Sequence, residues 1–171
     1  MILVTVGTTM PFDELFLEVD RLVGDGFFQE DVLCQVGQSR YRMQNCDWFI
    51  GRPTLRDLIA SSSLVITHGG ATVVELLLER KPFVAFPNPR GAGDHQGHFL
   101  ARMAQLAPIS WSREVAHLSA LFRERNSLGP AEPRCEMPHV ARMVLDGLRT
   151  DNGPQRPGLL DRFRRRTAEL V

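Results

Sequence analysis

Short apolar runs alternate along the chain with longer segments in which apolar residues recur every three or four positions. The short runs predict strands, and the periodic segments predict amphipathic helices. We expect strands at residues 1–6, 32–36, 48–50, 64–67, 83–86 and 109–111, and helices at residues 12–23, 54–62, 71–80, 95–107 and 113–125. Because strands that alternate with helices form parallel sheets covered on both faces, this pattern predicts an α/β, doubly wound fold.

The C-terminal part of the chain lacks this alternation. A loop rich in Pro and Gly at residues 126–138 precedes a predicted helix at residues 139–148. We therefore expect one domain over residues 1–149, followed over residues 150–171 by a polar tether and a basic amphipathic helix. That helix suits docking on a partner or on an anionic membrane surface, and a solvated basic helix is the equally simple alternative.

Length, charge and cysteine content narrow the choice of protein class. The 171 residues give room for one domain with a full hydrophobic core. Twenty basic residues balance twenty acidic ones, so there is no global charge to attract nucleic acid, and we expect none as a partner. The three cysteines show no C-x-x-C spacing, which favours a reduced, cytoplasmic setting. We expect neither a signal peptide nor a membrane span.

Three loops that join a predicted strand to a predicted helix have an unusual composition. They are Gly-Thr-Thr at residues 7–9, His-Gly-Gly-Ala-Thr at residues 68–72 and Arg-Gly-Ala-Gly-Asp-His-Gln at residues 90–96. Ligands of open α/β sheets bind outside the carboxyl ends of strands, where such loops lie. Glycines there let backbone N–H groups face an anion, so two of the loops can hold a diphosphate. Alternatively, the glycines only serve tight turns.

Glu75 falls in the first turns of the helix that follows the His-Gly-Gly loop. A carboxylate at this point can accept hydrogen bonds from the two hydroxyls of a ribose while the loop holds phosphates. The alternative is a capping box, T-x-x-E, between Thr72 and Glu75, which needs no ligand.

Three further polar residues are candidates for direct contact with a substrate. His68, at the end of a strand, can donate to a phosphate oxygen and offset charge on a leaving diphosphate, or it can be a structural histidine. Asp94 and Gln96, at a predicted helix start, can hold sugar hydroxyls, or they can be an N-cap and its solvated neighbour.

The sequence lacks the motifs of dinucleotide, serine-nucleophile and metal sites. The sequence contains no G-x-G-x-x-G fingerprint, no G-x-S-x-G nucleophile motif and no acidic metal cluster, so we expect no bound metal and no cofactor. The remaining pattern favours a cradle for a nucleotide sugar. No general base for sugar transfer stands out, although attack by a hydroxyl group needs one.

Motifs in order over about residues 2–110 point to one family. They are Val4-Thr5-Val6-Gly7-Thr8-Thr9, Phe12-Asp13, the run from Leu64 to Thr72 with Glu75, Lys81-Pro82, Phe86-Pro87-Asn88 and Asp94-His95-Gln96. Together they resemble the C-terminal, donor-binding domain of glycosyltransferase family 28. The resemblance is greatest to stand-alone subunits of two-component enzymes, namely the eukaryotic dolichol-linked N-acetylglucosamine transferase and PssE-type exopolysaccharide subunits. The interval from His68 to Glu75 is one residue shorter than in those subunits and resembles the peptidoglycan N-acetylglucosaminyltransferase.

The resemblance implies a Rossmann-like half domain of the GT-B type that binds a UDP-sugar without metal. It implies that Glu75 binds the ribose, that Asp94 and Gln96 bind the donor sugar, and that His68 stabilises the leaving diphosphate. Its remaining implication is a diphosphate site made of Gly7, Thr8, Thr9, His68, Gly69, Gly70, Ala71 and Thr72.

We therefore expect the donor-binding subunit of an inverting UDP-sugar glycosyltransferase, using UDP-N-acetylglucosamine or UDP-glucose in cell-surface polysaccharide synthesis. A membrane-anchored partner would bind the polyprenyl diphosphate-linked saccharide, supply the base and hold the chain at the cytoplasmic face of the membrane. A docking face of this kind can form homo-oligomers when the partner is missing. The alternative functions are a non-catalytic nucleotide-sugar scaffold or sensor and, less favoured, a UDP-sugar epimerase.

Overall fold

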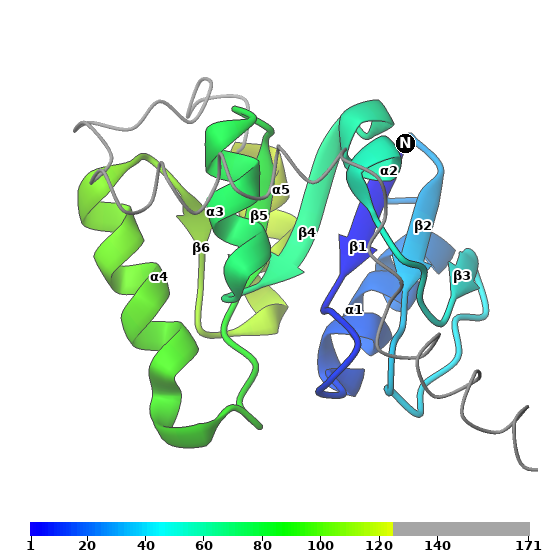
Figure 1. Cartoon of the computed structure of the whole chain (residues 1–171). Coiled ribbons are helices and arrows are strands. Elements are labelled where there is room, and N and C mark those ends of the chain that lie inside the picture. The colour runs from blue at the N-terminus through cyan, green and yellow to red at the C-terminus, as the bar shows by residue number, and fades with distance from the viewer. Residues whose placement is uncertain (125–171) are drawn as a thin grey trace, which may run out of the picture. The chain divides into compact units, whose positions relative to one another are not determined.

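The structure, a computed structural model, describes residues 1–124 apart from the side chain of Ala92. Its six strands are all parallel and lie in the order β3-β2-β1-β4-β5-β6 (Figure 1). Their bounds are Ile2–Thr5 (β1), Val32–Gln35 (β2), Asp47–Phe49 (β3), Leu64–His68 (β4), Phe83–Phe86 (β5) and Ser110–Trp111 (β6). The α/β, doubly wound parallel sheet predicted from the sequence is confirmed.

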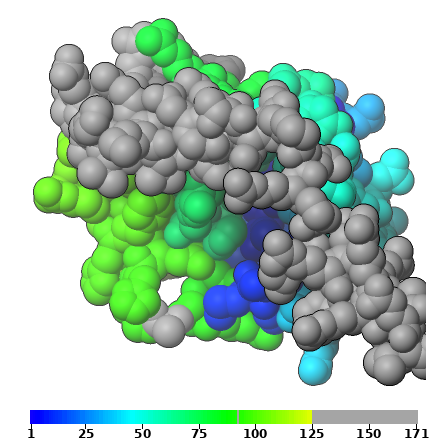
Figure 2. All heavy atoms as spheres, in the orientation of Figure 1, coloured from blue at the N-terminus to red at the C-terminus, as the bar shows by residue number. Residues whose placement is uncertain are grey.

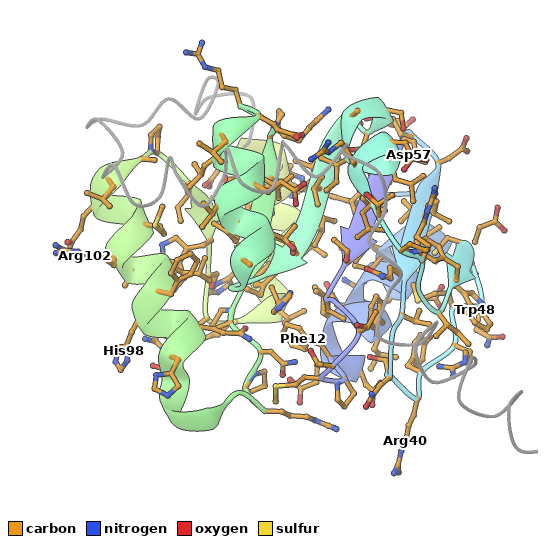
Figure 3. All side chains as sticks on the ribbon, viewed as in Figure 1. Phe12, Arg40, Trp48, Asp57, His98 and Arg102 are labelled. Atoms are coloured by element: carbon orange, nitrogen blue, oxygen red, sulfur yellow. The ribbon has the colours of Figure 1, made fainter. Side chains whose placement is uncertain are left out.

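Helices lie between successive strands except between β2 and β3, and they cover both faces of the sheet (Figure 1). Side chains fill the space between the helices and the sheet (Figure 3). Their bounds are Asp13–Gly24 (α1), Arg56–Ser61 (α2), Ala71–Leu78 (α3), His95–Leu106 (α4) and Leu118–Glu124 (α5), with short 3-10 turns at Ala92–Asp94 (η1) and Val115–His117 (η2). No helix within residues 1–124 is both long enough and apolar enough to cross a membrane.

The sheet separates two hydrophobic cores. Side chains of α1 and α5, such as Phe16 and Phe122, pack on one face of β1 and β4 against Val4 and Ile66. On the other face, Leu3 and Val65 pack with side chains of α2, α3 and α4. Alternation of side chains along a strand sends neighbouring residues to opposite cores, which explains why β1 and β4 are apolar up to their polar carboxyl ends at Thr5 and at Thr67 and His68.

Several predicted element bounds are wrong by a few residues. The helix expected from residue 54 begins at Arg56, because the Thr54 hydroxyl accepts the Arg56 N–H in a local turn (3.2 Å) before the helix starts. The helix expected over residues 71–80 ends at Leu78, since Arg80 is left-handed (φ 51°) and Lys81 N–H donates to the Leu76 carbonyl, a Schellman-type end.

The helix expected from residue 113 begins only at Leu118. A 3-10 turn precedes it, in which the Glu114 N–H donates to the Ser112 hydroxyl and the His117 N–H donates to the Glu114 carbonyl. The expected loop, helices and tether after residue 125, including the domain boundary at residue 150, lie outside the described residues and stay predictions.

The chain passes from β1 to β2 on one side of the sheet and later enters β4 on the other side of β1. Strand order therefore reverses between β1 and β4, the position where open α/β sheets bind ligands beyond the strand ends. The turns after β1, β4 and β5 all leave from this carboxyl edge, at the bottom of Figure 1. These are the three loops singled out in the sequence.

Candidate functional site

The turns that follow β1 and β4 lie side by side at the switch point. Gly7 is left-handed (φ 73°), and a Cβ placed on it would lie 3.6 Å from Cε1 of His68. Gly37, which follows β2, abuts the Gly7 carbonyl on the other side. Thr8 and Thr9 are exposed. In the space-filling view, blue atoms of the N-terminal segment reach the surface at the lower edge beside green atoms from the middle of the chain (Figure 2).

His68 lies at the end of β4 with its ring partly buried. Its Nδ1 atom is buried and has no hydrogen-bond partner among the described residues. Burial lowers the pKa of His68 below its ordinary value of 6.5, and a backbone interaction with Thr5 opposes this shift only in part. The imidazole of the free protein is therefore neutral at neutral pH.

We expect mild acid to destabilise the chain, and His68→Asn to reduce that loss. Below pH 6.5 the unfolded chain takes up a proton on this histidine that the folded chain resists. The free energy of unfolding therefore falls as the pH drops from that value towards the folded-state pKa, by at most about 1.4 kcal/mol per pH unit. Thermal unfolding across this pH range measures the effect, with His95→Asn, which removes an exposed imidazole, as the control. An identical pH dependence in wild type and His68→Asn would contradict it.

The turn after β4 leads into α3 beside the Gly7 turn. The space outside these two turns is called the crevice below. The Gly69 N–H donates to the Phe86 carbonyl (3.1 Å) and the Gly70 N–H donates to the His68 carbonyl (2.8 Å). Because both N–H groups are already bonded within the protein, these glycines offer a ligand room but no free hydrogen-bond donor. The N–H groups of Ala71 and Thr72 begin the helix, where the preceding turn supplies no helical acceptor. They are the donors that this loop can direct at an anion.

Gly70 packs directly against the imidazole ring of His68. A Cβ at this position would lie 2.5 Å from Nε2 of His68, so the imidazole ring occupies the space that a side chain would need. A Cβ on Gly69 would lie 3.0 Å from the carbonyl oxygen of Gln96 in α4. The two glycines thus bring α3, α4 and His68 together around one crevice.

Glu75 is half-buried in α3, one turn beyond Ala71. Burial raises the pKa of its carboxyl group, Glu79 adds to the shift, and Arg56 of α2 opposes it. The alternative role of Glu75 in a capping box is wrong, because the N-cap of α3 is Gly70 and makes no side-chain cap bond, which leaves Thr72 inside the helix. The carboxylate is therefore not committed to the helix start.

Asp94 takes part in an ion pair that the sequence did not predict. Asp94 has a left-handed backbone (φ 55°) and occupies the N-cap position of α4, but its side chain makes no cap hydrogen bond. The alternative in which this side chain caps the helix is therefore wrong. The Asp94 carboxylate instead accepts from Nη1 of Arg113, at 2.8 and 2.7 Å. Gly97 lies directly against this pair. Asp94 can contact a sugar only in competition with, or alongside, Arg113.

Gln96 and Asn88 connect the loop after β5 to the site. The Gln96 Oε1 accepts from the backbone N–H of Asn88 (2.8 Å), which orients the side-chain amide of Gln96. Asn88 is buried, and its Nδ2 donates to the Pro11 carbonyl (3.0 Å) while its Oδ1 accepts from the N–H of Arg90 (3.0 Å). The sequence analysis named Asn88 only within a family motif, yet its side chain joins the loop after β1 to the loop after β5.

Asn88→Ala is expected to lower the free energy of unfolding by about 1–2 kcal/mol, because two side-chain hydrogen bonds are lost and their backbone partners stay behind. Chemical denaturation measures this change. Asn45→Ala is the matched control, since Asn45 is exposed and its Nδ2 also donates to one backbone carbonyl, that of Asp20 (3.1 Å). Equal losses in the two variants would contradict the role given to Asn88.

Three polar side chains that the sequence analysis did not select lie in one row beneath the crevice. Thr5 pairs in register with Gln35 on one side and Thr67 on the other. The Thr5 hydroxyl donates to Oε1 of Gln35 (2.5 Å). Within residues 1–124, the buried side-chain polar atoms without a hydrogen-bond partner are Oγ1 of Thr67 and Nδ1 of His68, adjacent residues at the end of β4. The two side chains leave the strand on opposite faces, so these are two separate unsatisfied atoms at the carboxyl end of β4, where they favour a polar ligand.

Metal ligands do not gather in this part of the molecule. Across residues 1–124 no group of three or more His, Cys, Asp or Glu side chains is arranged to hold a metal ion. The chemistry that the described crevice can offer is therefore hydrogen bonding by helix-start amides, a neutral histidine and one half-buried carboxylate.

Comparison with known proteins agrees with this geometry. Residues 1–106 match the glycosyltransferase family 28 C-terminal domain. The fold is similar to that of a MurG from Acinetobacter baumannii, with a TM-score of 0.55 and 18% identity over 86% of this chain and 49% of that one. It is also similar to the glycotransferase of kitacinnamycin, with a TM-score of 0.51 and 19% identity over 86% of this chain and 37% of that one.

The chain spans about half the length of the first of these proteins and less of the second. No curated protein matches it. The fold expected from the sequence, a Rossmann-like half of the GT-B type, is confirmed by the parallel sheet and by this similarity. The family match covers more than half of the chain and includes all three loops of the crevice, and the chain belongs to the glycosyltransferase family 28 C-terminal domain family.

Proposed function

We propose that this chain binds the donor of an inverting UDP-sugar glycosyltransferase at the β1/β4 switch point. The observation that carries the proposal is that three features lie at the carboxyl ends of β1 and β4: the Gly7 turn, the first amides of α3, and the unsatisfied polar atoms of the last two residues of β4, Thr67 and His68. A diphosphate supplies the acceptor oxygens that such donors lack. The family match gives this anion site its context in sugar transfer.

Each part of a UDP-sugar has a proposed contact. Gly7, Thr8 and Thr9 lie on one side of the diphosphate, and the turn from Gly69 to Thr72 lies on the other, with donors from Ala71 and Thr72. Glu75 accepts hydrogen bonds from the ribose hydroxyls. Gln96, with Asp94 beside Arg113, contacts the donor sugar, which we propose to be glucose or N-acetylglucosamine.

The reaction we propose is direct attack of an acceptor hydroxyl on the anomeric carbon of the sugar. The bond from that carbon to the diphosphate breaks, and negative charge grows on the leaving UDP. The α3 amides and His68, protonated as the anion approaches, stabilise this charge without a metal ion.

The acceptor-binding half is proposed to be a membrane-associated partner that presents a polyprenyl diphosphate-linked saccharide and supplies the general base. Support comes from the motifs over residues 2–110, which resemble those of stand-alone subunits of two-component enzymes. On this proposal the chain works at the cytoplasmic face of the membrane in cell-surface polysaccharide synthesis.

A reconstituted transfer assay tests this division of roles. The full chain is mixed with membranes that contain the candidate partner, a labelled UDP-sugar and a lipid-linked acceptor. We expect transfer only when both proteins are present, with loss of transfer in Glu75→Ala but not in Glu79→Ala. Transfer by the partner alone, or an undiminished rate with Glu75→Ala, would overturn the proposal and favour a non-catalytic nucleotide-sugar scaffold.

A further inference from the structure

Two cysteines that are distant in sequence lie in contact beside the β2–β3 edge. Cys34 is a residue of β2 and is fully buried, whereas Cys46 directly precedes β3 and is half-buried. Their Sγ atoms are 3.7 Å apart. A disulfide requires about 2.05 Å between sulfurs, so a modest side-chain rotation would join the two thiols.

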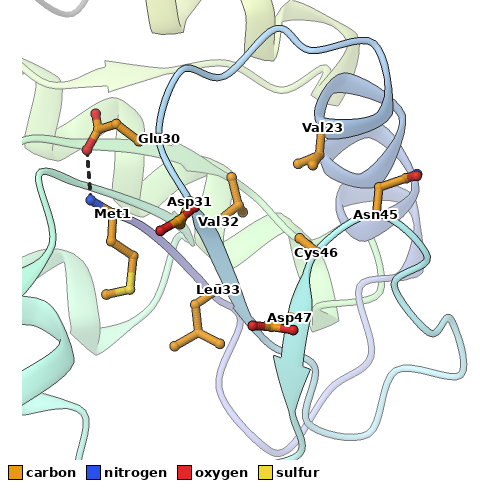
Figure 4. Close-up of a pocket in the computed structure, with 9 residues that line it drawn as sticks. All are labelled: Met1, Val23, Glu30, Asp31, Val32, Leu33, Asn45, Cys46 and Asp47. Atoms are coloured by element: carbon orange, nitrogen blue, oxygen red, sulfur yellow. Dashed lines mark hydrogen bonds and ion pairs between the residues drawn. The ribbon is translucent and has the colours of Figure 1, made fainter.

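The two thiols differ in their access to solvent. Cys46 lines an open pocket of about 460 Å³ at the edge where the strands begin, together with Val23, Val32 and Asp47 (Figure 4). Cys34 is not among the residues that line this pocket, and its side chain packs in the core with Val4 and Phe16. A small oxidant entering from solvent therefore meets Cys46 first.

The contact between the thiols also shifts their pKa values in opposite directions. Either thiol can donate in this contact. The interaction with Cys34 lowers the pKa of Cys46, while burial and the nearby Asp20 and Asp47 act in the opposite direction. The same interaction and burial raise the pKa of Cys34. Cys46 is thus the better nucleophile and Cys34 a protonated thiol within reach of it. The carboxylates around the pocket disfavour anionic oxidants and leave an uncharged peroxide as the suitable one.

We propose that Cys46 and Cys34 form a peroxide-reactive pair in which Cys46 is oxidised first and Cys34 converts the product to an intrachain disulfide. The Cys46 thiolate attacks one oxygen of hydrogen peroxide, the O–O bond breaks, and sulfenic acid and hydroxide form. The Cys34 sulfur then displaces the sulfenic hydroxyl group, which leaves as water with the Cys34 proton. In total, two thiols lose two hydrogens and one peroxide is reduced to two waters.

This site is independent of the proposed donor site. The pocket lies at the amino ends of the strands, whereas the crevice lies at their carboxyl ends. The disulfide would close the connection between β2 and β3, a segment already held by Asp20, whose carboxylate accepts from the N–H groups of Gln44 (3.0 Å) and Asn45 (2.8 Å).

The test uses the full chain carrying Cys135→Ser, which removes the third cysteine, outside the described residues. The folded protein is treated with hydrogen peroxide, remaining thiols are alkylated, and the products are identified by intact mass and peptide mapping. We expect loss of two hydrogens, a Cys34–Cys46 linked peptide and full reversal by dithiothreitol. Adding Cys34→Ala should instead leave a Cys46 sulfenic acid that dimedone traps, and adding Cys46→Ser should slow oxidation of Cys34 at least about tenfold.

Circular dichroism is used to check that each variant is folded. The Cys135→Ser protein, which keeps both Cys34 and Cys46, tests the proposal even if neither further substitution gives a folded chain. The proposal is overturned if that folded protein keeps both thiols reduced under peroxide that oxidises free glutathione. It is equally overturned if Cys46 passes to sulfinic acid without a linked species, because Cys34 would then not act on it.

Discussion

Replacing Glu75 with alanine is expected to weaken UDP binding at least about 100-fold. If the carboxylate accepts one hydrogen bond from each ribose hydroxyl, two bonds to a charged group are lost, each about 1.5–3 kcal/mol and so tenfold or more in affinity. Isothermal titration of the purified chain with UDP measures the change. 2′-Deoxyuridine diphosphate lacks one of the two hydroxyls, so it should bind wild type about tenfold more weakly than UDP, and Glu75→Ala should weaken its binding by only about a further tenfold.

Glu79→Ala is the matched control, because Glu79 is exposed just beyond the end of the same helix and carries the same charge. Folding gives a second check on Glu75. Burial raises the pKa of its carboxyl group, so the charged form is disfavoured in the folded chain and some stability is lost as the pH rises through that pKa. Glu75→Gln should therefore leave the free energy of unfolding at pH 7 unchanged or slightly higher. A large loss of stability together with the loss of UDP binding would mean that Glu75 is structural.

Gly37→Ala is expected to lower the free energy of unfolding by about 2–5 kcal/mol. Gly37 is left-handed (φ 53°), and a Cβ on it would overlap the carbonyl oxygen of Gly7 and lie 3.2 Å from the Cα of Thr8. The left-handed conformation of a non-glycine residue costs about 1–2 kcal/mol and overpacking about 1–3 kcal/mol. Because the obstacle is backbone, the Gly7 turn must move, and UDP affinity should fall as well.

Gly26→Ala separates the two costs. Gly26 is also left-handed (φ 68°), but a Cβ there would have nothing within 4 Å. It should lose only the conformational part and keep UDP affinity, as measured by chemical denaturation and titration. Equal destabilisation by the two substitutions would show that Gly37 does not press on the Gly7 turn.

The strands, helices and loops of the crevice could be predicted because they depend on local pattern. Apolar runs such as that of β4 and the glycines that follow them are visible in one stretch of sequence. The T-x-x-E pattern at Thr72 was a misleading local signal, since the start of α3 is set by Gly70 beneath the His68 ring.

The remaining parts of the site depend on which segments become neighbours. Thr5 and Thr67 form a row only because β1 lies between β2 and β4 in register. Asn88 reaches the carbonyl of Pro11 across 77 positions of sequence. Asp94 and Arg113 meet because the connection after β6 returns beside α4. Hydrophobic periodicity carries no information about such pairings.

The most direct test of the donor site is titration of the purified chain with UDP, UMP and ADP under the same conditions. Two turns face the diphosphate in our account, and the crevice is built around those phosphates and a ribose. UDP should therefore bind measurably, and more tightly than UMP, which lacks the second phosphate. UDP should also bind more tightly than ADP, because the proposed donor is a uridine nucleotide. Equal affinity for UDP and UMP, or no binding of UDP to the folded chain, would contradict the account.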